Sequence, residues 1–199
     1  MNRALVVTAL LLGACSEPTS PPRTSVYAFD FGGDVFHWPQ NRTPVRYFAD
    51  TRGNMRALVS RAIGAWEQQF LYGEFTGELV ADSNVADVIV TWGDSVPPDV
   101  TPDTGPAVFA CDGVTTLRLD SAGTALEEPI RTILRITNAQ AYSAAQFEAC
   151  VRRTAIHELG HTLGLLQESA VQADIMYSTV QAALPSGRDR QTVQVLYHT

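Results

Sequence analysis

The sequence predicts a single α+β domain that follows a short N-terminal region. Short runs of branched and aromatic residues, typical of strands, alternate with longer stretches whose apolar residues have helical spacing. The chain has 199 residues, of which 45% are hydrophobic and 18% charged. This length and composition are ordinary for a soluble globular protein with one well-packed core.

Five segments have the composition of strands, and one of them is apolar almost throughout. The run ADVIVTW, residues 86–92, lacks the alternation of a half-exposed strand, so we expect it to be buried on both faces. The segments are 43–50, 77–82, 86–92, 115–120 and 131–138. Between them, residues 93–113 show little periodicity and are interpreted as a surface loop.

Three segments have helical spacing, and two of them begin with a recognisable cap. Asn54 is a candidate N-cap for the first helix, and Ser143 with Gln146 makes a capping box for the second. The second helix should continue to Gly164, a residue suited to a helix end. The segments are 54–70, 143–164 and 188–199. The predicted order is strand, helix, several strands, helix, loop and helix.

The first residues have the features of an export signal. A short positive start and an apolar run precede LGAC, which resembles the lipobox of bacterial lipoproteins and ends at Cys15. We expect residues 1–14 to be a signal peptide, 15–25 a lipidated cysteine with a flexible tether, and 26–199 the domain. The protein would then be exported and lipid-anchored in a bacterial cell envelope. The alternative is an ordinary secretory signal that contains a cysteine.

If Cys15 carries lipid, Cys111 and Cys150 remain as a pair in an oxidising compartment. A disulfide between them is the favoured interpretation, and two buried free thiols are the alternative. Cys150 is an unsuitable zinc ligand beside His157, because seven helical residues span about 10.5 Å along the axis.

The formal net charge of −7 argues against a nucleic-acid partner and against a basic membrane-binding surface. We expect membrane contact only through the N-terminal lipid, and a monomeric domain. Four aspartates in the 93–113 loop are candidate calcium ligands, but their spacing matches no defined calcium loop, so structural Ca²⁺ is unsupported. They are Asp94, Asp99, Asp103 and Asp112.

The segment HELGH places two histidines and a glutamate at the spacing of a zinc hydrolase. His157 and His161 are four residues apart, so both imidazoles lie on one helical face and can bind one Zn²⁺ ion. Glu158 is offset by one position and can act as general base toward a zinc-activated water. The alternative, a solvated helical face, is disfavoured because Ile156, Leu159 and Leu163 make this helix amphipathic.

Beyond the helix, HELGHTLGL and the later IMYS together resemble the metzincin metalloproteases, and among them the matrixins. PVRYF, the helix with Trp66, ADVIVTW and a final helix ending in LY fall in matrixin order, so the resemblance covers most of residues 38–197. It implies a twisted mixed sheet with helices on one side, a cleft above the HExxH helix, and Met176 beneath one catalytic zinc. It also implies that a peptide substrate lies along an edge strand.

The resemblance assigns the third zinc ligand to position 167, where matrixins have His or Asp and this chain has Gln167. A neutral amide oxygen is a weaker donor than an imidazole, so we expect looser zinc binding. The neighbouring Glu168 and Asp174 are alternative carboxylate ligands. His37 and His198 do not follow the motif.

The sequence therefore predicts a zinc-dependent endopeptidase, with Glu158 as the catalytic base and His157, His161 and Gln167 as metal ligands. The competing hypothesis is a lipoprotein that keeps the fold and binds peptides or a partner with little or no cleavage. A gluzincin is excluded because its third ligand is a glutamate some twenty residues past the second histidine. Glu168 is the only glutamate after His161.

Overall fold

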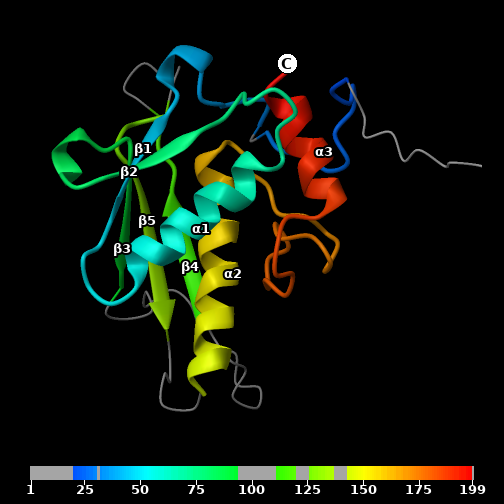
Figure 1. Cartoon of the computed structure of the whole chain (residues 1–199). Helices are drawn as coiled ribbons and strands as arrows, with labels where there is room; N and C mark the ends of the chain where they lie inside the picture. Colours follow the sequence, from blue (N-terminus) through cyan, green and yellow to red (C-terminus); the bar gives the residue numbers. More distant parts are fainter. Residues whose placement is uncertain (1–19, 31, 94–110, 120–125, 137–142, 199) are drawn as a thin grey trace, which may run out of the picture.

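A computed structural model of the chain describes residues 20–30, 32–93, 111–119, 126–136 and 143–198. These residues form a five-stranded mixed sheet and three α-helices (Figure 1). In chain order the elements are β1 (Val45–Ala49), α1 (Met55–Glu67), β2 (Gly77–Val80), β3 (Val88–Trp92), β4 (Cys111–Thr116), β5 (Ile130–Ile136), α2 (Ala144–Thr162) and α3 (Gly187–Leu196). The predicted α+β class is confirmed. The predicted signal peptide and Cys15 lie outside the described residues.

The strands are arranged in the order β2-β1-β3-β5-β4. Neighbours among β1, β2, β3 and β5 are parallel, whereas β4 pairs antiparallel with β5 and forms one edge of the sheet. The central strand β3 is buried on both faces at Val88, Ile89 and Val90, as its apolar sequence predicts.

The start of β4 differs from the prediction. The low periodicity of residues 93–113 predicts a loop that includes residues 111–113, with the strand beginning at Thr115. Asp and Gly are also uncommon in strands. In the structure the strand begins at Cys111, which pairs with Ile136, and Gly113 pairs with Leu134. Pairing with β5 therefore overrides the local preference.

Helices α1 and α2 pack against each other and against the sheet (Figure 1). Trp66 of α1 is fully buried, and its indole Nε1 donates a hydrogen bond to the Ile156 carbonyl of α2 at 2.7 Å. Asn54 precedes α1, but its side chain makes no capping hydrogen bond, and the helix ends at Glu67 rather than reaching Phe70. In the described part of the chain, no helix is both long and apolar enough to cross a membrane.

Helix α2 starts and stops where the sequence predicts, within two residues. The capping box of Ser143 and Gln146 is present, and the helix ends at Thr162. The predicted disulfide between Cys111 and Cys150 is confirmed, with a Cα–Cα distance of 5.8 Å. The disulfide joins the first residue of the edge strand to the first half of the helix that bears the HExxH motif.

The N-terminal segment packs along α3. Tyr27 donates a hydrogen bond from its hydroxyl to Asp189 Oδ1 at 2.8 Å, and Gln191 donates from Nε2 to the Thr24 carbonyl at 2.8 Å. Asp189 is fully buried and also accepts from the backbone N–H of Ile175. The same aspartate thus connects the N-terminal segment, α3 and the turn that carries Met176.

Candidate metal centre

Two imidazoles of α2 face each other across one helical turn. His157 is buried, His161 is partly exposed, and their Nε2 atoms are 3.2 Å apart. The rings are nearly perpendicular, with an interplanar angle of 87°. The four-residue spacing therefore brings both Nε2 atoms to one point on the helix surface, as the sequence predicts.

Each imidazole is held in a defined tautomer by a backbone carbonyl. His157 Nδ1 lies 2.8 Å from the Ile175 oxygen, and His161 Nδ1 lies 2.6 Å from the Leu165 oxygen. Because a carbonyl oxygen can only accept a hydrogen bond, both Nδ1 atoms must carry the donated proton. In the neutral rings the Nε2 lone pairs are then left free to bind a metal ion, which is the usual arrangement of metal-ligating histidines.

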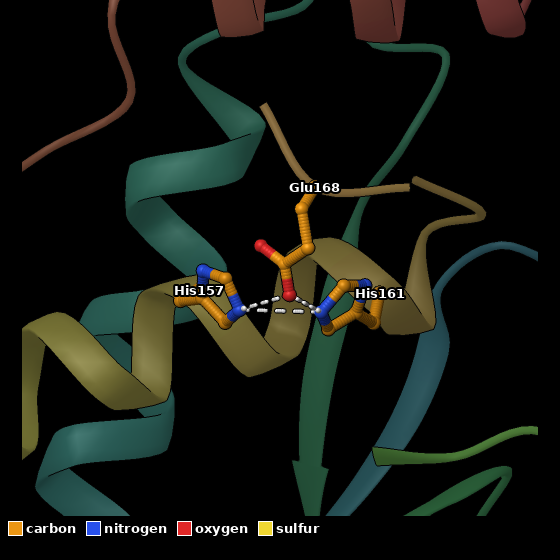
Figure 2. Close-up of side chains that lie close together, drawn as sticks. All are labelled: His157, His161 and Glu168. Atoms are coloured by element: carbon orange, nitrogen blue, oxygen red, sulfur yellow. Dashed lines mark hydrogen bonds and ion pairs between the residues drawn. The ribbon is translucent and has the colours of Figure 1, made fainter. Parts of the chain in front are cut away.

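A carboxylate completes the cluster. Glu168 Oε1 lies 3.5 Å from His157 Nε2 and 3.6 Å from His161 Nε2. Figure 2 shows the Glu168 carboxylate directed at the two imidazoles. The three potential ligand atoms all lie within 4.8 Å of one another. Tetrahedral zinc with bonds of about 2.0 to 2.1 Å requires its ligand atoms to be about 3.3 Å apart. The donor atoms and their spacing therefore fit a zinc ion with three protein ligands.

Gln167, the third ligand expected from the sequence, makes a different contact. Its amide Nε2 donates a hydrogen bond to the Asp30 carbonyl at 2.9 Å. Asp174, another alternative, is fully buried and accepts hydrogen bonds from Ser169 and Ser186. The geometry thus favours Glu168, which the sequence offered as an alternative to Gln167. It lies one residue past the family's ligand position.

The electrostatics of the cluster favour a bound cation. Partial burial by itself raises the pKa of Glu168, but hydrogen bonds and charge attraction from both imidazoles outweigh it and set the pKa at about 2. Burial by itself lowers the pKa of His157, but the nearby Glu168 and Glu158 carboxylates outweigh it, so the pKa lies above its usual value. Both shifts indicate a site that stabilises positive charge, either a proton or a metal ion.

Glu158 points to the edge strand rather than to bulk water. It is 4% exposed, and its Oε2 accepts a 2.7 Å hydrogen bond from the Thr115 hydroxyl of β4. A Cβ atom added at Gly113 would lie 2.5 Å from Glu158 Oε1, so the carboxylate uses the space that a side chain would fill. Burial raises the pKa of Glu158, a shift in the direction that suits a general base.

Met176 packs against α2 at Gly160, which lies between the two histidines in the sequence. It is fully buried, and a Cβ atom added at Gly160 would lie 2.4 Å from its sulfur and 2.7 Å from Trp66. Glycine in the middle of a helix is destabilising by roughly 1 kcal/mol relative to alanine. At Gly160 it allows the methionine and the indole to approach the helix backbone between the histidines.

Gly164 turns the chain after α2 back toward the histidines. Its φ is +100°, a conformation that residues with a side chain rarely adopt, and an added Cβ would lie 1.8 Å from the Phe36 carbonyl oxygen. The turn leads directly into Leu165, whose carbonyl orients His161, and then to Glu168. The sequence predicts a helix end at Gly164 but gives no sign of the contact with Phe36.

Comparison with known proteins agrees with this fold. The family model for matrixins, a family of metallopeptidases, matches residues 45–198. The chain therefore belongs to the matrixin family, and the resemblance seen in the sequence is confirmed. No curated protein shows a significant match to the chain.

Proposed function

We propose that the protein is a zinc-dependent endopeptidase in which His157, His161 and Glu168 hold the metal and Glu158 is the general base. The convergence of three donor atoms with near-tetrahedral spacing carries this proposal. It is supported by the two backbone carbonyls that fix the imidazole tautomers, since an adventitious histidine pair has no need of them. Membership of a metallopeptidase family supports it independently.

A bound zinc ion supplies Lewis acidity and lowers the pKa of a coordinated water to about 7. The chain's own contribution is to hold Glu158 ready to accept the proton of the attacking water and to pass it to the leaving amine. Thr115 fixes one carboxylate oxygen by hydrogen bonding, and Gly113 leaves room for the other.

The substrate in this proposal is an extended peptide that lies along β4. Within the described residues β4 is an edge strand, paired on one side with β5. An exposed edge can pair with the backbone of an added strand, which gives affinity without requiring a particular sequence. Thr115 and Gly113 of the same strand contact Glu158, so a peptide on this edge would lie close to the base.

The test combines zinc stoichiometry with peptide cleavage. The full chain, stripped of loose metal and supplied with zinc, should retain about one ion and cleave an unfolded protein substrate. The Glu158→Ala variant should keep the zinc and lose the cleavage, because Glu158 is not a ligand in this arrangement. Retained zinc without cleavage by the unaltered chain would favour the peptide-binding alternative. Failure to retain zinc would overturn the proposed metal site.

We also propose that the protein is exported and anchored through a lipid on Cys15. The support is the signal-like sequence of residues 1–14 and the disulfide, which is typical of oxidising compartments. Growth with a radiolabelled fatty acid should label the unaltered protein but not a Cys15→Ser variant. Equal labelling of both would contradict the proposal.

A further inference from the structure

We propose that Gln167 is a positioning residue that holds Glu168 at the metal, rather than a metal ligand itself. This inference rests on the zinc site proposed above and concerns how the chain builds it. It explains why the family's ligand position is occupied here by an amide that can donate a hydrogen bond.

On its N-terminal side, Glu168 is preceded by two residues anchored to the same distant segment. The Leu166 backbone N–H donates to the Phe29 carbonyl at 3.1 Å. The Gln167 side chain donates from Nε2 to the Asp30 carbonyl at 2.9 Å, across 137 positions in sequence. Consecutive residues of the loop are therefore tied to consecutive residues of the N-terminal segment, one through its backbone and one through its side chain.

On its C-terminal side, Glu168 is followed by an equally fixed residue. The Ser169 backbone N–H donates to the Met176 carbonyl at 2.7 Å, and its hydroxyl donates to the buried Asp174 at 2.5 Å. The Glu168 side chain remains 44% exposed, and its carboxylate contacts the two histidines. Its carboxylate is thus placed by the anchors on either side of it rather than by burial.

The chemistry of the contact requires a donor at position 167. The Asp30 carbonyl oxygen can only accept a hydrogen bond, and the amide N–H of Gln167 donates one to it. An ionised carboxylate at the same place could not donate, so two hydrogen-bond acceptors would repel each other. Such a carboxylate would, however, be a better zinc ligand than an amide. The two roles for residue 167 therefore predict opposite effects of the change Gln167→Glu.

The experiment measures zinc affinity of the full chain by competition with a chelating dye, for the unaltered protein, Gln167→Glu and Gln167→Met. If Gln167 is a positioning residue, both of its variants should bind zinc about 10-fold more weakly than the unaltered protein. This is the lower end of the loss in metal affinity seen when a residue that orients a metal ligand is replaced. Gln172→Glu adds the same charge to an exposed turn nearby and should leave affinity unchanged. Circular dichroism of the metal-free proteins checks that each variant is folded.

A second measurement separates positioning from simple loss of structure. The visible spectrum of bound Co²⁺ reports the ligand set and its geometry. Gln167→Met should retain the spectrum of the unaltered protein at saturating Co²⁺, because Glu168 still binds, whereas Glu168→Ala should change it.

Tighter zinc binding by Gln167→Glu, or an unchanged spectrum in Glu168→Ala, would overturn the inference while leaving a zinc peptidase intact. If the unaltered protein bound no zinc, the proposed function would fail first and the inference with it.

Discussion

The proposed metal centre has two halves that are built in different ways. His157 and His161 lie on one rigid helix, and their separation is set by the helical repeat. Glu168 lies on the loop after α2, and its position depends on Gly164 and on contacts with residues far away in sequence. The helical half is therefore encoded locally, whereas the loop half is encoded by tertiary contacts. Substitutions in the two halves should therefore have different effects on zinc binding and stability.

The largest effects are expected at the ligands themselves. His161→Ala should abolish stoichiometric zinc binding, because it removes one of two neutral nitrogen donors and leaves the other ring alone with a carboxylate. Glu168→Ala should bind zinc far more weakly than the unaltered chain but retain a trace of affinity at the histidine pair. Metal analysis after dialysis against a weak chelator measures both. Equal zinc retention by Glu168→Ala and the unaltered protein would contradict the division into two halves.

Gly164→Ala should damage the loop half and leave the helical half folded. The substitution places a Cβ at φ +100° and 1.8 Å from a backbone oxygen, so the turn must move. Strain of this kind costs on the order of 1–3 kcal/mol, and the clash adds to it. The temperature of thermal unfolding and the zinc affinity should both fall.

Gly73→Ala is the matched control, since Gly73 has φ +71° but no atom within 4 Å of the added Cβ. Its unfolding temperature should fall only by the amount that the backbone strain causes, and its zinc affinity should be unchanged. A larger loss of stability in Gly73→Ala than in Gly164→Ala would contradict this explanation.

Removal of the disulfide should weaken the helical half without moving the ligands. The change Cys111→Ser with Cys150→Ser removes a crosslink between β4 and α2 whose two ends are 39 positions apart in sequence. Loss of such a crosslink lowers the free energy of unfolding by about 2 to 4 kcal/mol. Denaturant unfolding should show this loss while the folded double variant retains one zinc ion. Loss of zinc from the folded variant would show that the disulfide also positions the site.

The smallest effect is expected at Thr115, which contacts the base but none of the proposed metal ligands; its hydroxyl lies 2.7 Å from Glu158 Oε2 and 3.1 Å from the Thr132 hydroxyl. Thr115→Val keeps the shape of the side chain but removes the hydroxyl that donates to Glu158. The loss of one hydrogen bond to a charged group is worth about 1.5 to 3 kcal/mol, so turnover should fall by roughly tenfold or more with zinc affinity unchanged. Thr115→Ser should restore most of the activity. Equal kcat values for Val and Ser variants would exclude a role for the hydroxyl.

The same contrast explains what the sequence could predict. The capping box at Ser143, the helical positions of His157 and His161, and the buried strand β3 all follow from periodicity and short-range chemistry. The choice between Gln167 and Glu168 does not, because it depends on where the N-terminal segment places the Asp30 carbonyl. The early start of β4 at Cys111 was missed for a similar reason, since pairing with β5 decides it.

The most direct test is a crystal structure of the zinc-loaded chain, with anomalous scattering recorded at the zinc edge. We expect one zinc peak bound by Nε2 of His157, Nε2 of His161 and a carboxylate oxygen of Glu168, with the Gln167 amide hydrogen-bonded to the Asp30 carbonyl. A peak coordinated by the Gln167 oxygen, with Glu168 turned away to solvent, would contradict it.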